Sequence, residues 1–89
     1  MIISDYGRDK FSLRNREDLS VIKTIKHTFG FLRNGLYYPE QKVVVLGIDN
    51  KLVEFDLENM KIIKNVKTMN SVLHLEKVND DTILIGEGS

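Results

Sequence analysis

Short runs of apolar residues alternate with polar, turn-forming residues along the whole chain. Val43 to Ile48 is continuously apolar, as expected for a strand that is covered on both faces. After the turn residues Asp49-Asn50-Lys51, the segment from Leu52 to Asp56 alternates, which places Val53 and Phe55 on one face. Runs of this kind predict about nine short strands, grouped in the order three, four and two. They span residues 2–4, 10–15, 21–28, 31–38, 43–48, 52–56, 61–68, 72–78 and 82–86.

The chain also resembles itself when it is displaced by 41 residues, so that Lys10-Phe11 aligns with Lys51-Leu52. A second match, interrupted by about two residues, aligns Val43–Gly47 with Thr82–Gly86. A repeat of this length is typical of one supersecondary unit stacked on copies of itself. We therefore expect a single partial domain over residues 1–89, with an incomplete unit at 1–28, a complete unit at 29–69 and an incomplete unit at 70–89.

Composition also favours strands. Alanine, the best helix former, is absent, while Ile, Val and Thr together supply 21 of the 89 residues. Proline occurs once, at Pro39, where it would end a strand because it cannot donate a hydrogen bond to the neighbouring strand. An all-β, antiparallel architecture follows from these features.

An alternative architecture fits part of the same pattern. Leu19, Ile22, Ile25 and Phe29 have helical spacing, and a second stripe of this kind runs from Met60 to Met69. Acidic residues precede both segments, as they often precede helices. On this interpretation the chain is an α+β ferredoxin-like sandwich, and it would act as a small regulatory or ligand-sensing domain.

Charge and cysteine content exclude several classes of function. The 13 basic and 13 acidic residues cancel, so electrostatic capture of nucleic acid or of an anionic membrane is not expected. Cysteine is absent, so there is no disulfide framework and no thiolate metal site. The longest apolar run is too short to span a bilayer, and the N-terminal residues lack the features of a secretion signal. We expect a soluble protein of the cytoplasm.

The residues of the central unit resemble a blade of a WD-repeat β-propeller. Phe55-Asp56 stands where that family has its Trp-Asp pair, and Asp49 stands in the turn where it usually keeps an aspartate. Lys26-His27-Thr28 falls where a Gly-His pair introduces the next blade. The resemblance spans nearly all of the chain, although tryptophan is absent and Arg14-Asn15 replaces the Trp-Asp pair in the first unit.

This resemblance implies four-stranded blades arranged around an axis, here as a partial propeller. It also implies a structural hydrogen-bond network, of which His27, Asp49, Phe55 and Asp56 would hold part. Phenylalanine cannot supply the indole N–H that tryptophan would donate, so this network would be weakened at Phe55.

Candidate catalytic residues are few, and each has a simpler structural explanation. We expect His27 to join strands and His74 to lie at a solvated position, pointing away from a face shared by Leu73 and Leu75. The pair Asp80-Asp81 fits a polar turn better than acid–base catalysis. We expect a solvated strand edge for Lys61, Lys64 and Lys67, and aromatic packing for Tyr37-Tyr38. We expect Gly86-Glu87-Gly88-Ser89 to form the turn after the last strand. No catalytic, cofactor or metal site is predicted.

The expected function is a non-catalytic protein-interaction or scaffold module. A blade cannot bury both faces of its sheet alone, so the chain would be part of a longer polypeptide, assemble with itself, or be completed by protein partners. Partners would dock on turns at its two rims, such as Asp5–Asp9, Pro39–Lys42 and Asp49–Lys51. Nucleic acid and membranes are not expected among its partners.

Overall fold

A computed structural model describes residues 2–4, 9–28 and 30–88 of the chain, and within these residues it contains strands and turns but no helix. All strand pairs in it are antiparallel. The strands are β1 (Ile2–Ser4), β2 (Lys10–Arg14), β3 (Val21–Lys26), β4 (Leu32–Tyr38), β5 (Val43–Ile48), β6 (Lys51–Asp56), β7 (Lys61–Lys67), β8 (Ser71–Asn79) and β9 (Thr82–Gly88).

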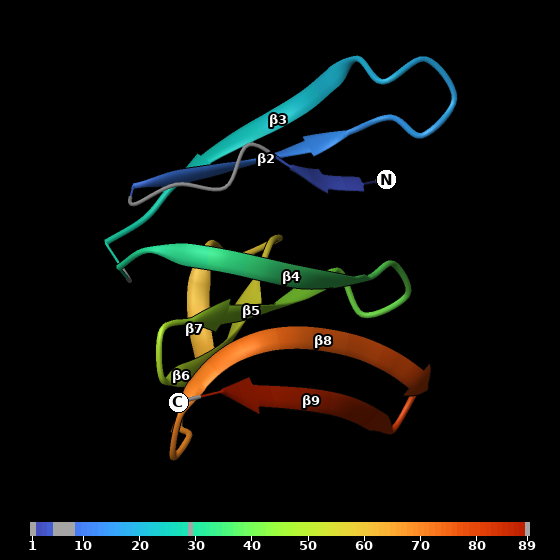
Figure 1. The fold of residues 1–89 in the computed structure, drawn as a ribbon. Coiled ribbons are helices and arrows are strands. Elements are labelled where there is room, and N and C mark those ends of the chain that lie inside the picture. Colours follow the sequence, from blue (N-terminus) through green and yellow to red (C-terminus); the bar gives the residue numbers. More distant parts are fainter. Residues whose placement is uncertain (1, 5–8, 29, 89) are drawn as a thin grey trace.

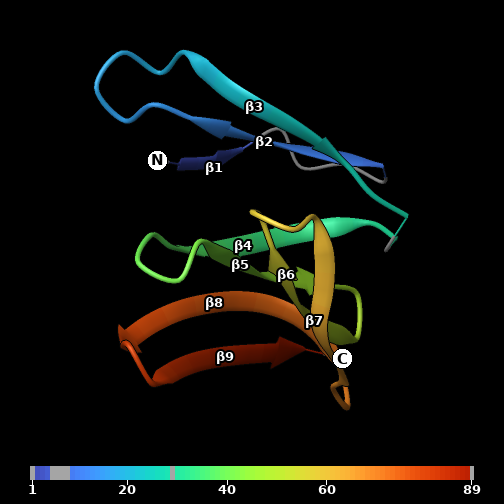
Figure 2. The same cartoon turned by 180° about the vertical axis from the view of Figure 1, so that it is seen from behind.

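The strands form three sheets that follow one another along the chain. The first sheet has the order β1-β2-β3, the second β4-β5-β6-β7 and the third β8-β9. Figures 1 and 2 show the second sheet lying between the other two, so the sheets are layered in chain order. The all-β class and the grouping of three, four and two strands predicted from the sequence are therefore confirmed.

The second sheet is buried on both faces at β5. Val44, Leu46 and Ile48 point toward the first sheet, while Val45 points toward the third, and all four are buried. The apolar run from Val43 to Ile48 predicted this twofold burial. Burying each such side chain contributes roughly 1.5–3 kcal/mol, so β5 is the main anchor of the stack.

The principal core lies between the first and second sheets. Its buried members are Ile3, Phe11, Leu13, Ile25, Leu32, Val44, Leu46, Ile48, Val53 and Phe55. They come from β1, β2 and β3 on one side and from all strands of the second sheet except β7 on the other. This core fixes the relative position of the two sheets.

The chain adds the strands of a sheet in order from one edge to the other, and then passes back to the first edge to begin the next sheet. β4 begins the second sheet at one edge, and the chain steps strand by strand to β7, whose residues are all exposed. It then passes back to β8, which contacts β4. β3, at the far edge of the first sheet, is likewise followed by β4. The strands that begin the sheets, β1, β4 and β8, therefore lie side by side, and we call them inner strands. β3 and β7, which end the first two sheets, lie at the opposite edges, and we call them outer strands.

The repeat seen in the sequence is reproduced in the strand register. Lys10 pairs with Lys26 and Lys51 pairs with Lys67, and every further pair of β2–β3 has its counterpart in β6–β7 at a displacement of 41 residues. The register shift between Leu13 and Arg14 recurs at the corresponding place in β6, between Glu54 and Phe55. Backbone pairing thus follows the repeat even where the side chains differ.

The third sheet repeats β4 and β5 with a smaller displacement. The register shift of β8 lies between Val72 and His74, and that of β4 between Leu32 and Asn34, a displacement of 40 residues. In β9, Gly86 takes the place of Gly47, as the sequence match indicated. The sheets are therefore variants of one unit.

The helical alternative is wrong. Both segments with helical spacing contain strands, namely β3 and β7. Their side chains are β-branched, and each strand pairs in register with the strand before it. The ferredoxin-like α+β sandwich is excluded with them. Gly86–Gly88 also differs from prediction, because β9 continues through it instead of ending in a turn.

Candidate interaction surfaces

The turns lie at two opposite rims of the stack. At the first rim, the turn after β4 meets the turn after β6: the Leu57 backbone N–H donates to the Lys42 carbonyl over 3.0 Å, and Lys42 Nζ lies 3.9 Å from Glu58 Oε1. The turn between β8 and β9 lies beside them, with Lys77 Nζ 4.8 Å from the centre of the Tyr38 ring. Figure 1 shows the turns at residues 15–20, 39–42 and 80–81 on the same side of the stack, and the hydrogen bond of Leu57 joins the turn at 57–60 to them; we call these four turns the first rim.

The second rim holds the connections between sheets. The Asp49 carbonyl accepts a hydrogen bond of 2.6 Å from the Val72 backbone N–H, and Asn50 accepts one of 2.7 Å from Thr68. The Asp49 carboxylate lies 3.6 Å from Arg33 Nε, at the start of β4. Of the predicted rim segments, Pro39–Lys42 thus lies on the first rim and Asp49-Asn50 on the second, while residues 5–8 lie outside the described residues.

His27 and Phe55, two members of the predicted network, line one pocket of about 570 Å³ between the first and second sheets. His27 is buried, with only 7% of its surface exposed, and its ring centre lies 5.9 Å from that of Phe11. Its backbone N–H donates to the Asp9 carbonyl over 2.8 Å. Burial lowers the pKa of His27 from its ordinary value, and the charge of Asp9 opposes the shift. His27 thus joins the end of β3 to the core.

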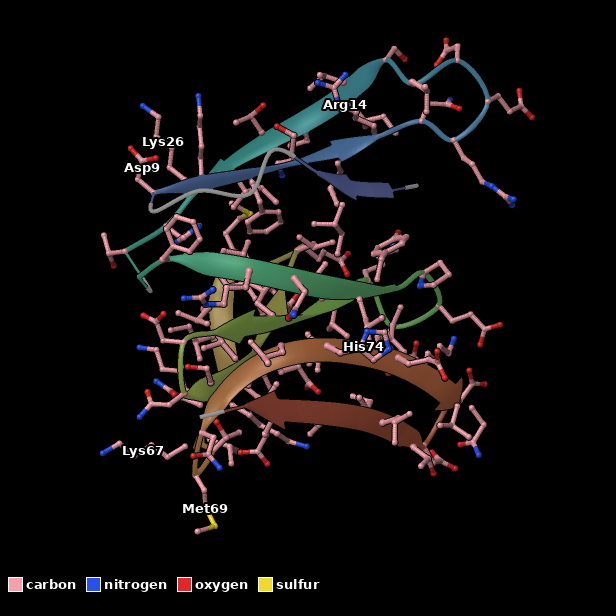
Figure 3. All side chains as sticks on the ribbon, viewed as in Figure 1. Asp9, Arg14, Lys26, Lys67, Met69 and His74 are labelled. Atoms are coloured by element: carbon pink, nitrogen blue, oxygen red, sulfur yellow. The ribbon has the colours of Figure 1, made fainter. Side chains whose placement is uncertain are left out.

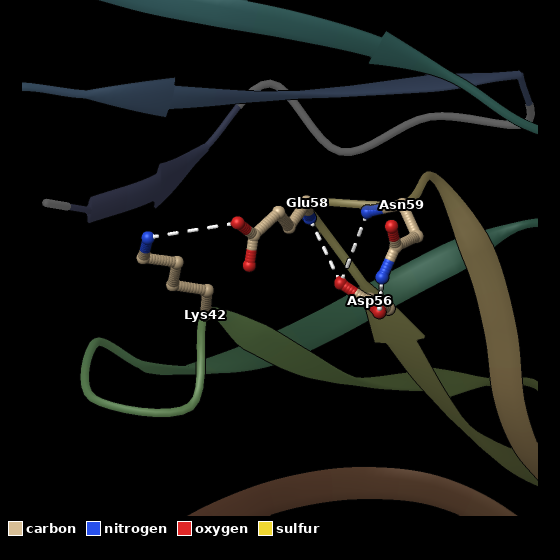
Figure 4. A network of polar contacts seen from close by, with 4 residues as sticks. All are labelled: Lys42, Asp56, Glu58 and Asn59. Carbon is tan, nitrogen blue, oxygen red and sulfur yellow. Dashed lines mark hydrogen bonds and ion pairs between the residues drawn. The ribbon is translucent and has the colours of Figure 1, made fainter.

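Asp56 closes the turn between β6 and β7 (Figure 4). Its Oδ1 accepts hydrogen bonds from the backbone N–H groups of Glu58, over 2.9 Å, and Asn59, over 3.2 Å, while its Oδ2 accepts one from Asn59 Nδ2 over 2.8 Å. The Asn59 side chain, and then its backbone N–H, hold the pKa of Asp56 below its ordinary value. His27 and Phe55 line one pocket, Asp49 faces Arg33, and Asp56 caps a turn, so the four residues occupy three places.

The second and third sheets are joined by a smaller apolar interface. Val72 is fully buried and Leu75 nearly so, and the Asn34 amide donates a hydrogen bond of 3.4 Å to the Val72 carbonyl. A Cβ atom added to Gly47 would overlap Asn34 Oδ1 on β4 and would lie 2.9 Å from Val72 Cγ1, so the glycine makes room first for Asn34 and then for β8. Further out, a groove of about 560 Å³ opens between the two sheets, lined by Tyr38, Val45, Glu54, Lys64, Asp81 and Ile83, among others.

The other face of the third sheet, which we call the open face, is turned away from the second sheet. Leu73 is 60% exposed and Leu84 is 53% exposed. His74 and Glu76 lie on the same face, with His74 Nε2 3.7 Å from Glu76 Oε1, and Figure 3 shows His74 on β8. The open face therefore combines exposed apolar side chains with a strand, β9, that has a neighbour on one side only among the described residues.

The remaining predicted positions divide into confirmed and corrected ones. Lys61, Lys64 and Lys67 are exposed along β7, as predicted for a solvated edge strand. Tyr38 is buried and Tyr37 half-buried, which confirms packing for this pair. Asp80-Asp81 forms the predicted turn, where Asp80 lies 3.1 Å from Lys77 Nζ.

His74 is solvated as predicted, but Leu73 and Leu75 do not share a face. The register shift between Val72 and His74 breaks the alternation, which leaves Leu73 exposed and Leu75 buried. Alternation alone could not have found the apolar part of the open face. The feature that points to it is the correspondence of β8 with β4, whose pairing with β5 carries the same register shift.

Comparisons with protein-family models, curated proteins and solved structures find no match for this chain. The described residues include no group of three or more His, Cys, Asp or Glu side chains placed to hold a metal ion. They also include no helix with the length and apolar character needed to cross a membrane.

Proposed function

We propose that the chain is a non-catalytic protein-interaction module of the WD-repeat propeller type, acting as a scaffold within a larger assembly. The observation that carries the proposal is the open face of the third sheet, where Leu73 and Leu84 are exposed on a sheet of two strands. Exposed apolar sheet faces with a free edge mark surfaces that another polypeptide covers. Its partners are proteins or further blades, and we expect it to act in the cytoplasm.

Two further features support the propeller type. Each sheet starts with an inner strand, proceeds outward and is followed by the inner strand of the next sheet. The turn positions Asp49 and Asp56 and the buried His27 stand at the ends of strands, where the resemblance to WD-repeat blades implies them. On this basis the second sheet is a complete blade and its neighbours are incomplete ones.

The mechanism we propose is display. The stacked sheets hold the turns of both rims in fixed positions, because their cores and register leave little freedom to the strand ends. The first rim presents Glu40 and Asp81 on exposed turns, and on the second rim Asn50 and Lys26 are exposed. Partner proteins bind one rim while the open face is covered in the assembly.

The test compares proteins retained by the immobilised chain and by three double variants. One removes first-rim groups (Glu40→Ala with Asp81→Ala), one removes second-rim groups (Lys26→Ala with Asn50→Ala), and the matched control changes two exposed residues of β7 (Lys61→Ala with Lys64→Ala). We expect one rim variant to lose a protein that the wild type and the control retain. Equal retention by all three variants, with unchanged circular dichroism, would refute display by the rims.

A further inference from the structure

The second sheet shows how a complete unit pairs its second and third strands. β5 and β6 pair along their length, with Val45 opposite Glu54, Gly47 opposite Leu52 and Ile48 opposite Lys51. β9 corresponds to β5, and β2 corresponds to β6. The partner that β9 would have in a complete unit is therefore a strand of the β2 type, and this chain carries such a strand.

Transferring the register of β5–β6 to β9 and β2 produces complementary pairs. Leu84 comes to lie opposite Leu13, Gly86 opposite Phe11, and Glu87 opposite Lys10. The first pair is apolar and the third joins opposite charges, and both kinds of cross-strand pair are favourable. At the second pair, the missing side chain of Gly86 leaves room for the ring of Phe11.

From this complementarity we infer that the open third sheet is completed by a second copy of the chain, whose β2 and β3 pair with β9. The inference rests on the proposed function and names the partner that covers the open face. The composite sheet has the order β8-β9 from one copy followed by β2-β3 from the next, which reproduces β4-β5-β6-β7. Backbone hydrogen bonds along β9 and the burial of Leu73 and Leu84 drive the association.

A second contact arises between sheets in this arrangement. Within one chain, Phe55 on β6 faces the first sheet and shares a core with Leu13. In the 41-residue repeat, Arg14 of the first sheet corresponds to Phe55, and Glu54 of the second sheet corresponds to Leu13. In the assembly, Arg14 of one copy therefore lies against Glu54 of the other, so an ion pair takes the place of the apolar contact.

β1 occupies the edge of β2 that the second copy would use. It pairs with β2 through three residues, Ile2 to Ser4, and Ile3 lies opposite Leu13, the position that Leu84 of the partner would take. A strand of seven residues, β9, can replace a strand of three because it offers more backbone partners. Release of β1 is therefore part of the association step.

The association is head-to-tail, so it leads to a ring when the rotation between copies closes. Each copy contributes the second sheet and one composite sheet, which makes two four-stranded units. Propellers of four to eight blades are stable, so rings of two, three or four copies are expected.

Size-exclusion chromatography with light scattering on the 89-residue chain tests the inference. We expect a mass of two, three or four times that of one chain. Leu84→Asp should weaken association at least tenfold, while Val66→Asp, an equally exposed position on β7, should leave it unchanged. The inference would be overturned by a monomer with intact β-sheet circular dichroism. It would also be overturned if the assembly formed by the Leu84→Asp variant had the same mass as that of the wild type.

Charge exchange tests the partner's identity and the direction of assembly. Arg14→Glu and Glu54→Arg should each weaken association about tenfold, and the double variant should recover it. Mixing a Lys10→Glu/Arg14→Glu chain with a Leu84→Asp chain should yield one-to-one dimers, because one intact interface remains. Failure of both the recovery and the mixed dimer would overturn the pairing of β9 with β2. Rim-dependent binding by a monomer would still leave the proposed function standing.

Discussion

Leu19 and Met60 stand 41 residues apart and share a left-handed backbone, with φ angles of 62° and 57°. In both turns an Asn or Asp four residues earlier caps the backbone. Asn15 Oδ1 accepts a hydrogen bond of 2.8 Å from the Glu17 N–H, and Asp56 Oδ1 accepts one from the Glu58 N–H. The repeat therefore preserves a strained turn even though neither residue is glycine.

Glycine at these two positions should stabilise the chain. A left-handed conformation costs a side-chain-bearing residue roughly 1–2 kcal/mol, which glycine avoids. We expect Leu19→Gly and Met60→Gly each to raise the free energy of unfolding by about 1 kcal/mol in urea titrations. Val66→Gly, on the exposed strand β7, is the control and should lower it by a similar amount because glycine weakens strands. Destabilisation at both turn positions would show that their side chains matter more than the backbone.

The close approach of β8 to Gly47 predicts a coupling between two residues. Gly47→Ala places a methyl group against both Asn34 and Val72 and should cost about 1–3 kcal/mol through overpacking. In the background of Val72→Ala, the same change should cost somewhat less, because the part of the space that Val72 fills is vacated while Asn34 stays in place. A double-mutant cycle by chemical denaturation measures the difference. Strict additivity would mean that Asn34 alone, and not Val72 of the third sheet, limits the space at Gly47.

His27 should make stability depend on pH. Because burial lowers its pKa in the folded state, the unfolded chain binds more protons as pH falls below the ordinary value of 6.5. The free energy of unfolding should therefore decline from pH 7.5 to pH 5.5. His27→Gln should flatten this slope. A slope that is unchanged in His27→Gln would exclude His27 as its source.

Asp56 should also make the free energy of unfolding fall as pH falls, but at lower pH than His27 does. Its pKa lies below the unfolded value of 3.8, so the stabilisation is present above that pH and is lost as pH falls through the folded pKa. Asp56→Asn should keep the turn, as Asn15 does in the first sheet, and remove this part of the acid sensitivity. Unfolding curves between pH 5 and pH 2.5 measure the effect, with Asp81→Asn as a control. Equal acid sensitivity in Asp56→Asn and the wild type would contradict it.

Much of the fold could be predicted because local chemistry and the repeat agree. The continuous run Val43–Ile48 indicates burial on both faces, and alternation in β6 places Val53 and Phe55 in the core. The open face could not be predicted in the same way. A register shift at Leu73 depends on pairing with β9, a tertiary contact that alternation within one strand does not encode.

The predicted network could be only partly anticipated. Its positions at strand ends follow from turn chemistry, since Asp49 and Asp56 tolerate or cap tight turns. Which of them meet depends on tertiary structure: the stacking of the first two sheets brings His27 and Phe55 to one pocket, whereas Asp49 faces Arg33 within the second sheet.

The passage from the outer strand of each sheet to the inner strand of the next makes the stack extensible. A further segment of 41 residues inserted at Thr68–Asn70 would add a layer without rerouting any existing strand. Growth by tandem duplication therefore needs no new kind of connection, and the number of layers can change while each old layer keeps its strand order.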